Sequence, residues 1–213
     1  MKHKIIFLSF FLFVSLSCFA QRSADDILKK AEKVYLSEGA VKADFIAKTI
    51  SQRGGNAETM KGTVLMDGSK FYLDGSDLKV WYDGNNQWVL LANSDEVNLT
   101  KPTEDELSAI NPASFFKYYK KGFRSKVKGS TVLNGSACDE VVLTPLNSKG
   151  GISKLTIFID QKTGRIRSLQ VENTNGVTSQ ISIMNYQTKQ MFSDSQFKFD
   201  TSKYPDIEVI DLR

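Results

Sequence analysis

The feature that most constrains the fold is a turn signal that recurs at short intervals along the chain. Asp-Gly or Asn-Gly pairs stand at residues 67–68, 74–75, 83–84, 134–135 and 175–176. Such pairs favour the tight turns that join neighbouring antiparallel strands. The segments between the first three pairs are short, and apolar and polar residues alternate in several segments of the chain, which is typical of half-buried strands. The sequence therefore predicts a mainly β (α+β) protein with about ten to eleven strands.

A helix is predicted before the first strand. The Ser23 hydroxyl can cap free backbone N–H groups, and Asp25 and Asp26 suit the positive end of the helix dipole. Apolar residues then recur on one helical stripe as far as Tyr35, and Gly39 ends the helix. Alternation begins at residue 41 with the first predicted strand, and residues 196–199 form the last one.

A helical insert is predicted in the centre of the chain. Thr103 and Glu106 have the spacing of a capping box, in which each side chain satisfies the other residue's backbone N–H group. Asn111 followed by Pro112 predicts a second helix start, and that helix should run to about Lys121.

The first twenty residues have the pattern of a secretory signal peptide. Lys2 and Lys4 precede an apolar run, and Ala20 provides a small residue at the expected cleavage site. The expected organisation is a signal peptide at 1–20 and a single domain at 21–213, exported and without a membrane span. Cys18 leaves one alternative open, a lipidated N-terminus.

The exported part lacks the residues that most catalytic and metal sites need. The only histidine, His3, lies in the signal peptide, so imidazole catalysis and histidine-bound metals are not expected. Cys138 would then be a single cysteine, which favours a buried apolar role. Loss of Lys2 and Lys4 lowers the formal charge from +4 to +2, which is too small for nucleic-acid binding. We expect neither an enzyme nor a bound cofactor or metal.

The aromatic content is high, with 14 Phe, 7 Tyr and 2 Trp. Residues 115, 116, 118 and 119 are all aromatic and cover most of the circumference of the central helix. Two interpretations stay open: a well-packed core between helices and sheet, or helices that cover an apolar cavity on a curved sheet.

Several segments resemble the outer-membrane lipoprotein carrier (LolA-like) family. They are the Asp-Gly-x-x-x-Trp stretch at 83–88, the Pro-Thr-x-x-Glu-Leu helix start at 102–107, the Asn-Pro-Ala-Ser-Phe-Phe stretch at 111–116 and the closing segment 206–210. The resemblance implies an incomplete, strongly curved antiparallel barrel, closed by the N-terminal helix and a central helical lid. One departure is clear: residues 66–69 read Met-Asp-Gly-Ser, where known carriers place an Arg and a Pro ahead of the Phe.

The resemblance also implies a function. A protein of this family would be a monomeric periplasmic carrier that shields the acyl chains of lipoproteins. Its donor would be an inner-membrane lipoprotein-release transporter, and its acceptor would lie at the outer membrane. The residues predicted to line the acyl-chain cavity, from inward strand positions and from the covering helix, are Val64, Met66, Phe71, Trp88, Leu90, Phe115, Phe116 and Tyr119.

Three other functions compete with the carrier. A sensor of the same fold would bind lipids or lipoproteins and signal to a membrane partner. A β-rich structural or adhesion module would have a filled interior. A hydrolase is the third, and the missing histidine argues against it.

Overall fold

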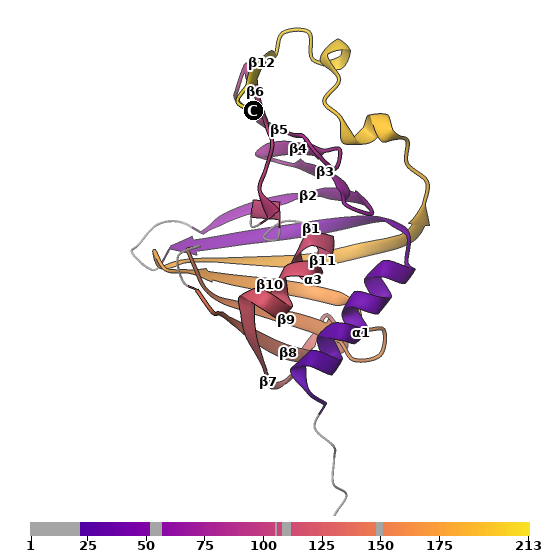
Figure 1. Ribbon diagram of the computed structural model, residues 1–213, viewed down its shortest axis with the longest axis vertical. Helices are drawn as coiled ribbons and strands as arrows, with labels where there is room; N and C mark the ends of the chain where they lie inside the picture. Colours follow the sequence, from indigo (N-terminus) through magenta and orange to yellow (C-terminus); the bar gives the residue numbers. More distant parts are fainter. Residues whose placement is uncertain (1–21, 52–56, 105, 108–111, 148–150) are drawn as a thin grey trace, which may run out of the picture.

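The computed structural model describes residues 22–51, 57–104, 106–107, 112–147 and 151–213, and its main feature is one curved sheet (Figure 1). Among these residues the sheet has twelve strands, in the spatial order β12-β6-β5-β4-β3-β2-β1-β11-β10-β9-β8-β7. The predicted signal peptide and Asn111 lie outside the described residues. The mainly β fold is confirmed, with slightly more strands than the sequence predicts.

The sheet consists of two meanders joined along β1 and β11. All neighbouring strands are antiparallel except β12, which lies parallel to β6. The strands are β1 (Ala40–Ser51), β2 (Glu58–Asp67), β3 (Lys70–Gly75), β4 (Leu78–Tyr82), β5 (Gln87–Leu91), β6 (Glu96–Thr100), β7 (Phe123–Leu133), β8 (Ser136–Pro145), β9 (Ile152–Asp160), β10 (Ile166–Asn173), β11 (Val177–Gln190) and β12 (Glu208–Asp211).

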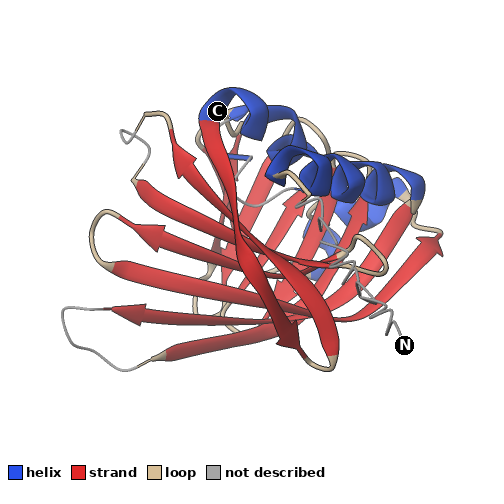
Figure 2. Cartoon of the chain, turned by 90° about the horizontal axis from the view of Figure 1, so that it is seen from below, coloured by secondary structure: helices blue, strands red, loops and turns tan. Residues whose placement is uncertain are grey.

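The sheet bends strongly but does not close, because β12 and β7 remain its two edges (Figure 2). The β1–β11 register shifts between Ala40 and Asp44, and such bulges bend a strand. Gly62 permits a further close approach, since a Cβ atom there would overlap the carbonyl oxygen of Asp74 on β3. The result is the incomplete barrel that the family resemblance implies.

The predicted N-terminal helix and the helix predicted after Asn111 are both present and lie on the same side of the sheet (Figure 2). Helix α1 (Ala24–Ser37) begins where predicted, since the Ser23 side chain accepts a hydrogen bond from the Asp26 backbone N–H. Helix α3 (Pro112–Gly122) is the helix predicted after Asn111. The segment between β6 and α3 is called the insert from here on. The predicted capping box is also confirmed, because the Glu106 carboxylate accepts from the Thr103 backbone N–H at 2.8 Å. No helix in the described part of the chain is both long enough and apolar enough to cross a membrane.

The C-terminal segment differs from the prediction. Residues 196–199 do not form a strand: Asp194–Phe197 is a 3-10 helix (η2), and a second one (η3, Thr201–Lys203) follows. The apolar alternation that suggested a strand reflects burial of Phe197 and Phe199 instead. From β11 the segment runs past β3 and β4 and ends as β12 beside β6 (Figure 1).

The turn after β9 is held by a buried carboxylate and also contacts α1. Asp160 accepts hydrogen bonds from the Thr163 backbone N–H at 2.8 Å and from Arg167 Nη2 at 3.0 Å. In the same turn, Lys30 on α1 donates to the Gln161 carbonyl. Burial acts to raise the pKa of Asp160, but these hydrogen bonds outweigh it and hold the pKa well below its usual range.

This carboxylate should therefore stabilise the fold only while it is ionised. Its pKa is lower in the folded than in the unfolded chain, so its contribution is complete above about pH 4 and is lost as the pH falls towards the folded-state pKa. We expect Asp160→Asn to lower the free energy of unfolding by about 2 kcal/mol at pH 7. Urea unfolding at pH 7 and pH 3 should show a clearly smaller difference between variant and wild type at pH 3; equal differences would contradict this role.

Candidate functional site

The space under the two helices is the first place to look for a binding site. The inner face of α1 presents Ala24, Ile27, Leu28 and Ala31, which are all buried. They pack in one apolar cluster with α3 and with residues of β8 and β9. Apart from hydroxyl groups, the side chains of this cluster are hydrocarbon, so the helices rest on the sheet through non-directional contacts.

Helix α3 supplies the aromatic part of this cluster. Phe115, Phe116 and Tyr119 are 7%, 3% and 2% exposed. The rings of Phe115 and Tyr119 stack with centroids 5.6 Å apart, and Phe116 meets Tyr35 of α1 at 5.9 Å. All three were predicted to line a cavity. Here their rings occupy the space between the helices and the sheet.

A small hollow lies beside these rings. A space of about 50 Å³ lies among α1, α3, β2, β10 and β11, and Met66, Phe116 and Ile183 contribute to its wall. It can hold a few water molecules at most. This hollow is too small for a long acyl chain, which could occupy it only if the helices or their side chains moved.

The predicted strand residues Val64, Met66 and Phe71 belong to a second apolar cluster on the same face of the sheet. Met66 pairs with Phe71 across β2 and β3, and Phe71 stacks against Tyr82 with ring centroids 5.4 Å apart. Met66 also reaches the small hollow beside Phe116. The structure thus brings six of the eight predicted residues to the inner face.

Trp88 and Leu90 are placed differently from the prediction. Trp88 opposes Trp81, and Leu90 opposes Val97, and these residues form a third cluster with Phe199 of the C-terminal segment. Directly paired residues share a face, and Trp81 is the chain neighbour of inward-facing Tyr82, so this cluster lies on the outer face. The assignment of Trp88 and Leu90 to inward positions was wrong.

A polar group at the end of α1 was not predicted. Glu38 is only 8% exposed, and its carboxylate accepts from Arg165 Nε at 2.5 Å and from the Tyr186 hydroxyl at 2.8 Å. The Arg165 guanidinium also lies over the Tyr186 ring, 5.0 Å from its centroid. Burial, followed by the Glu38 carboxylate, holds the pKa of Tyr186 well above its usual range. This Glu38–Arg165–Tyr186 group fastens α1 to β10 and β11.

A second polar contact fastens α1 to the β2–β3 turn. The Tyr35 hydroxyl donates to the Gly68 carbonyl at 3.3 Å. Burial, followed by the nearby charge of Asp67, raises the pKa of Tyr35 to about 12, so the hydroxyl stays protonated at neutral pH. This contact falls in the Met-Asp-Gly-Ser stretch that departs from the family pattern.

The Tyr119 hydroxyl is buried without a hydrogen-bond partner among the described residues. Burial raises the pKa of Tyr119 to about 12. An unpartnered buried hydroxyl destabilises the closed arrangement, so we expect Tyr119→Phe to raise the free energy of unfolding by about 1 kcal/mol. Urea unfolding would measure this, with Tyr186→Phe as the control that loses a real hydrogen bond and is destabilised. A Tyr119→Phe variant less stable than wild type would contradict the expectation.

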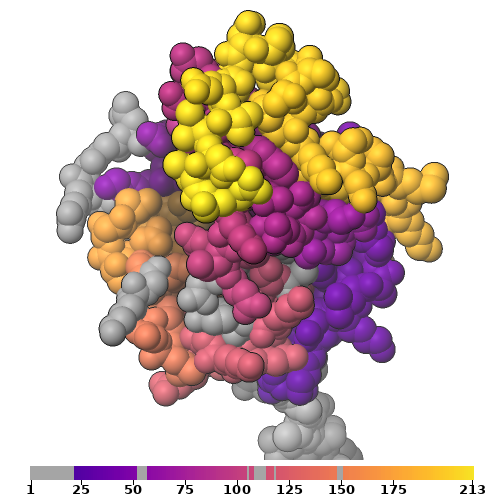
Figure 3. All heavy atoms as spheres, turned by 45° about the horizontal axis from the view of Figure 1, so that its top comes forward, coloured from indigo at the N-terminus to yellow at the C-terminus, as the bar shows by residue number. Residues whose placement is uncertain are grey.

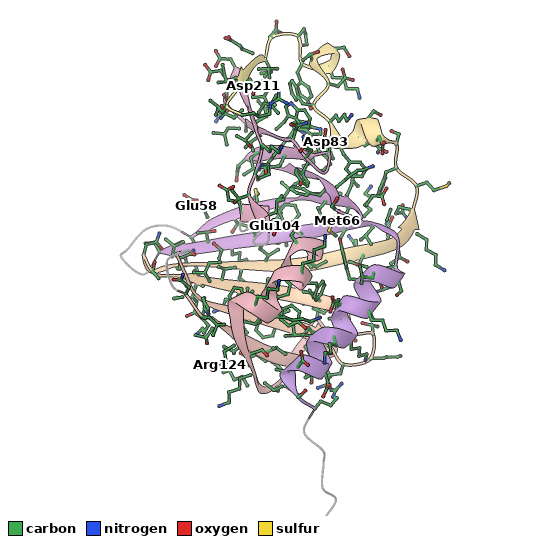
Figure 4. All side chains as sticks on the ribbon, viewed as in Figure 1. Glu58, Met66, Asp83, Glu104, Arg124 and Asp211 are labelled. Atoms are coloured by element: carbon green, nitrogen blue, oxygen red, sulfur yellow. The ribbon has the colours of Figure 1, made fainter. Side chains whose placement is uncertain are left out.

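A larger pocket of about 470 Å³ opens beside the central insert. Figure 3 shows the central segment, magenta to pink, in the middle of one face, below the yellow C-terminal residues. Glu104, labelled in Figure 4, lies on the segment between β6 and α3. The described lining residues come from the β2–β3 and β4–β5 turns, from the insert and from α3: Ser69, Tyr82, Gly84, Asn85, Lys101, Pro102, Glu104, Leu107, Ser114, Lys117 and Lys121.

The described side chains of this site are mainly apolar. The described residues include no group of three His, Cys, Asp or Glu side chains that could hold a metal ion. Cys138 lies fully buried on β8, as predicted, and burial raises the pKa of its thiol, which favours the unreactive protonated form. The inner face offers an apolar surface beneath helices fastened by a few polar contacts.

Comparison with solved structures found similar proteins at low sequence identity, and the first of them shows the same fold. An uncharacterised conserved protein from Thermus thermophilus has a TM-score of 0.60 at 10% identity, and the match covers 88% of this chain and 98% of that one. A LolA superfamily protein from Nitrosomonas europaea gives 0.46 at 11% identity, covering 84% and 99%. The lipoprotein LppX from Mycobacterium tuberculosis gives 0.47 at 12% identity, covering 78% and 95%.

Comparison with curated proteins gave no match in sequence. A match to a family does exist, and it spans residues 16–163, from before α1 to the turn after β9. Helices α1 and α3 and strands β1 to β9 fall in this range, including the inner-face residues of α1, α3 and β2. The chain therefore belongs to the family of the outer membrane lipoprotein carrier protein LolA.

Proposed function

We propose that this protein is a non-enzymatic carrier that holds the acyl chains of a lipoprotein between its helices and the inner face of its sheet. Family membership and fold support the coarser part of this proposal, lipid or lipoprotein binding. The finer parts of the proposal are the carrier role, an exported periplasmic location and a monomeric state. We further propose an inner-membrane release transporter as donor and an outer-membrane acceptor.

The observation that carries the proposal is the continuous apolar inner face under two helices. The clusters of α1, α3, β8 and β9 and of β1 to β4 both lie on this face. Burying an acyl chain is worth about 0.8 kcal/mol per CH₂, or on the order of 13 kcal/mol for sixteen carbons before costs. That gain can offset displacement of the Phe115, Phe116 and Tyr119 rings.

A structural module with a filled interior is the second candidate. The specific observation in its favour is the small size of the hollow, about 50 Å³, beside Phe116. Such a module would not respond to acyl chains, which makes the two candidates separable by one measurement.

The test is acyl-dependent binding by the purified protein. We expect a hydrophobic fluorescent probe to brighten on binding and a long-chain acyl ligand to displace it. A triacylated lipoprotein should bind, and the same lipoprotein without its acyl chains should not. Mass spectrometry of lipid that co-purifies would identify the natural cargo. If neither acylated lipoprotein nor acyl ligand binds, the carrier proposal is wrong and the filled module is favoured.

The location of the ligand can be tested through the two tryptophans. Trp81 and Trp88 both lie in the outer-face cluster, so the sheet backbone separates them from an inner-face ligand. We therefore expect an acyl chain with bromine near its end, which quenches only nearby rings, to leave the tryptophan emission essentially unchanged while it displaces the probe. Strong tryptophan quenching would place the ligand on the outer face instead.

A further inference from the structure

The larger pocket has a basic rim that the proposed function does not explain. Three lysines contribute to its lining, Lys101 from the segment after β6 and Lys117 and Lys121 from α3. Glu104 is the only carboxylate among the described lining residues. Within the described part of the chain, none of these lysines forms an ion pair. The rim therefore carries excess positive charge towards the pocket.

Ordinary helix chemistry accounts for only part of this charge. A lysine near a helix C-terminus interacts favourably with the helix dipole, which explains the position of Lys121. Lys117 and Lys121 are four residues apart, however, and like charges at this spacing repel each other on one helix face. Lys101 comes from a separate segment. The neighbouring Lys120, by contrast, is paired with Glu32 of α1 at 3.0 Å.

The wall of the same pocket leads to the apolar interior. Tyr82 and Leu107 line the pocket and are only 5% and 8% exposed. Both belong to the second apolar cluster, together with Met66 and Phe71. A ligand at this pocket would thus meet positive charge at its outer end and hydrocarbon at its inner end.

We propose that this pocket binds the anionic headgroup of an acylated lipid, with a phosphate against Lys101, Lys117 and Lys121 and the acyl chain directed past Tyr82 and Leu107 to the inner face. Lys ammonium groups bind phosphate oxygens through charge-assisted hydrogen bonds. The proposal rests on the proposed function for the acyl chain and adds a preference for a negatively charged headgroup.

The test compares two lysophospholipids with the same acyl chain, lysophosphatidylglycerol with a net negative headgroup and lysophosphatidylcholine with a zwitterionic one. We expect the wild-type protein to bind the anionic lipid at least tenfold more tightly at low salt, with the preference shrinking as salt is added. The triple variant K101E/K117E/K121E should lose this preference, whereas an uncharged monoacylglycerol with the same acyl chain, which has no phosphate, should bind to it within about twofold of wild type. Circular dichroism would confirm that the variant is folded.

A matched control changes three exposed lysines outside the pocket, K33E/K126E/K162E, and so alters net charge by the same amount. It should retain the preference; equal loss in both triple variants would mean that net charge, and not this pocket, sets it. Inorganic phosphate tests whether the pocket binds a free anion instead of a lipid headgroup. If millimolar phosphate displaces lysophosphatidylglycerol, and if the affinity for this lipid does not depend on its acyl-chain length, the lipid assignment is overturned. Equal binding of both lipids by wild type overturns the headgroup site but leaves the carrier intact, whereas binding of neither overturns the carrier.

Discussion

Replacing Phe116 by Ala is expected to make the protein less stable and, at the same time, a better binder of acyl chains. The ring is 3% exposed and contacts Tyr35, Phe115 and Tyr119 with centroids within 6.4 Å. Removing a buried phenyl ring leaves a cavity and costs about 3–5 kcal/mol of unfolding free energy. The new cavity would join the existing hollow, whose wall already includes Phe116 and Met66.

The gain in affinity follows from what the ligand no longer has to displace. In the wild-type protein an acyl chain must move the Phe116 ring away from its apolar neighbours, whereas in Phe116→Ala the space is already empty. A binding penalty smaller by about 1.4 kcal/mol corresponds to a tenfold lower dissociation constant. We therefore expect about tenfold tighter binding of a long-chain acyl ligand, measured by probe displacement, alongside a lower urea midpoint.

Phe199→Ala is the matched control for this prediction. Phe199 is also buried, stacks on Tyr204 at 5.1 Å and meets Trp81 at 5.3 Å, but it belongs to the outer-face cluster. The control should lose comparable stability without any gain in acyl affinity. Weaker or unchanged binding by Phe116→Ala would show that the ring is an ordinary core residue and that the ligand does not lie beneath α3.

The strands of the first meander could be predicted closely because local signals fix them. The turn pairs at 67–68, 74–75 and 83–84 separate segments whose bounds agree with β3, β4 and β5 to within two residues. Turn chemistry acts over a few residues and is therefore visible in the sequence. The same applies to α1, which begins after its Ser23 cap.

The faces of β4 and β5 could not be assigned from the same signals. Val80, Trp81 and Tyr82 are all buried, because the inner face packs under the insert and the outer face is covered by the C-terminal segment. When both faces are covered, the alternation that would distinguish them disappears. Trp88 and Leu90 were therefore assigned to the wrong face, and strand pairing together with their packing near Phe199 corrects the assignment.

Nor could the packing of the interior be read from composition. The same aromatic residues on α3 are compatible with a hollow or with a filled space, and the difference depends on how Phe115, Phe116 and Tyr119 meet the sheet. The Glu38–Arg165–Tyr186 group also depends on contacts in space that the sequence does not show. Arg165 and Tyr186 lie 127 and 148 residues from Glu38 in sequence. No local pattern connects them.

The second large effect is expected at this polar group. We expect Glu38→Ala to lower the free energy of unfolding by about 3 kcal/mol. Removing one partner of a buried ion pair leaves the other without compensation, at a cost of about 3–5 kcal/mol for fully buried pairs. The Arg165 side chain is 32% exposed, so water can partly replace Glu38 and the lower end of this range applies. Tyr186 would lose its acceptor as well.

A double-mutant cycle separates this pair from other effects of the substitutions. Arg165→Ala alone leaves the Glu38 carboxylate buried without its ion-pair partner, with the Tyr186 hydroxyl still donating to it, whereas Glu38→Ala/Arg165→Ala removes both charges. The double variant should therefore be more stable than the sum of the single changes predicts, by about 1–2 kcal/mol. Strict additivity would mean that the two side chains do not stabilise each other despite their contact.

Loss of the pair should also alter how the helix opens. Glu38 caps the end of α1, and Glu38, Arg165 and Tyr186 all contribute to the wall of the small hollow. Near this end of α1, the contact from Tyr35 to Gly68 is a single neutral hydrogen bond, which is weaker than a charge-assisted one. We therefore expect faster amide hydrogen exchange in the last turn of α1 in Glu38→Ala, and faster entry of an acyl probe in stopped-flow measurements. Faster exchange without faster entry would show that ligands reach the inner face from the other side, at α3.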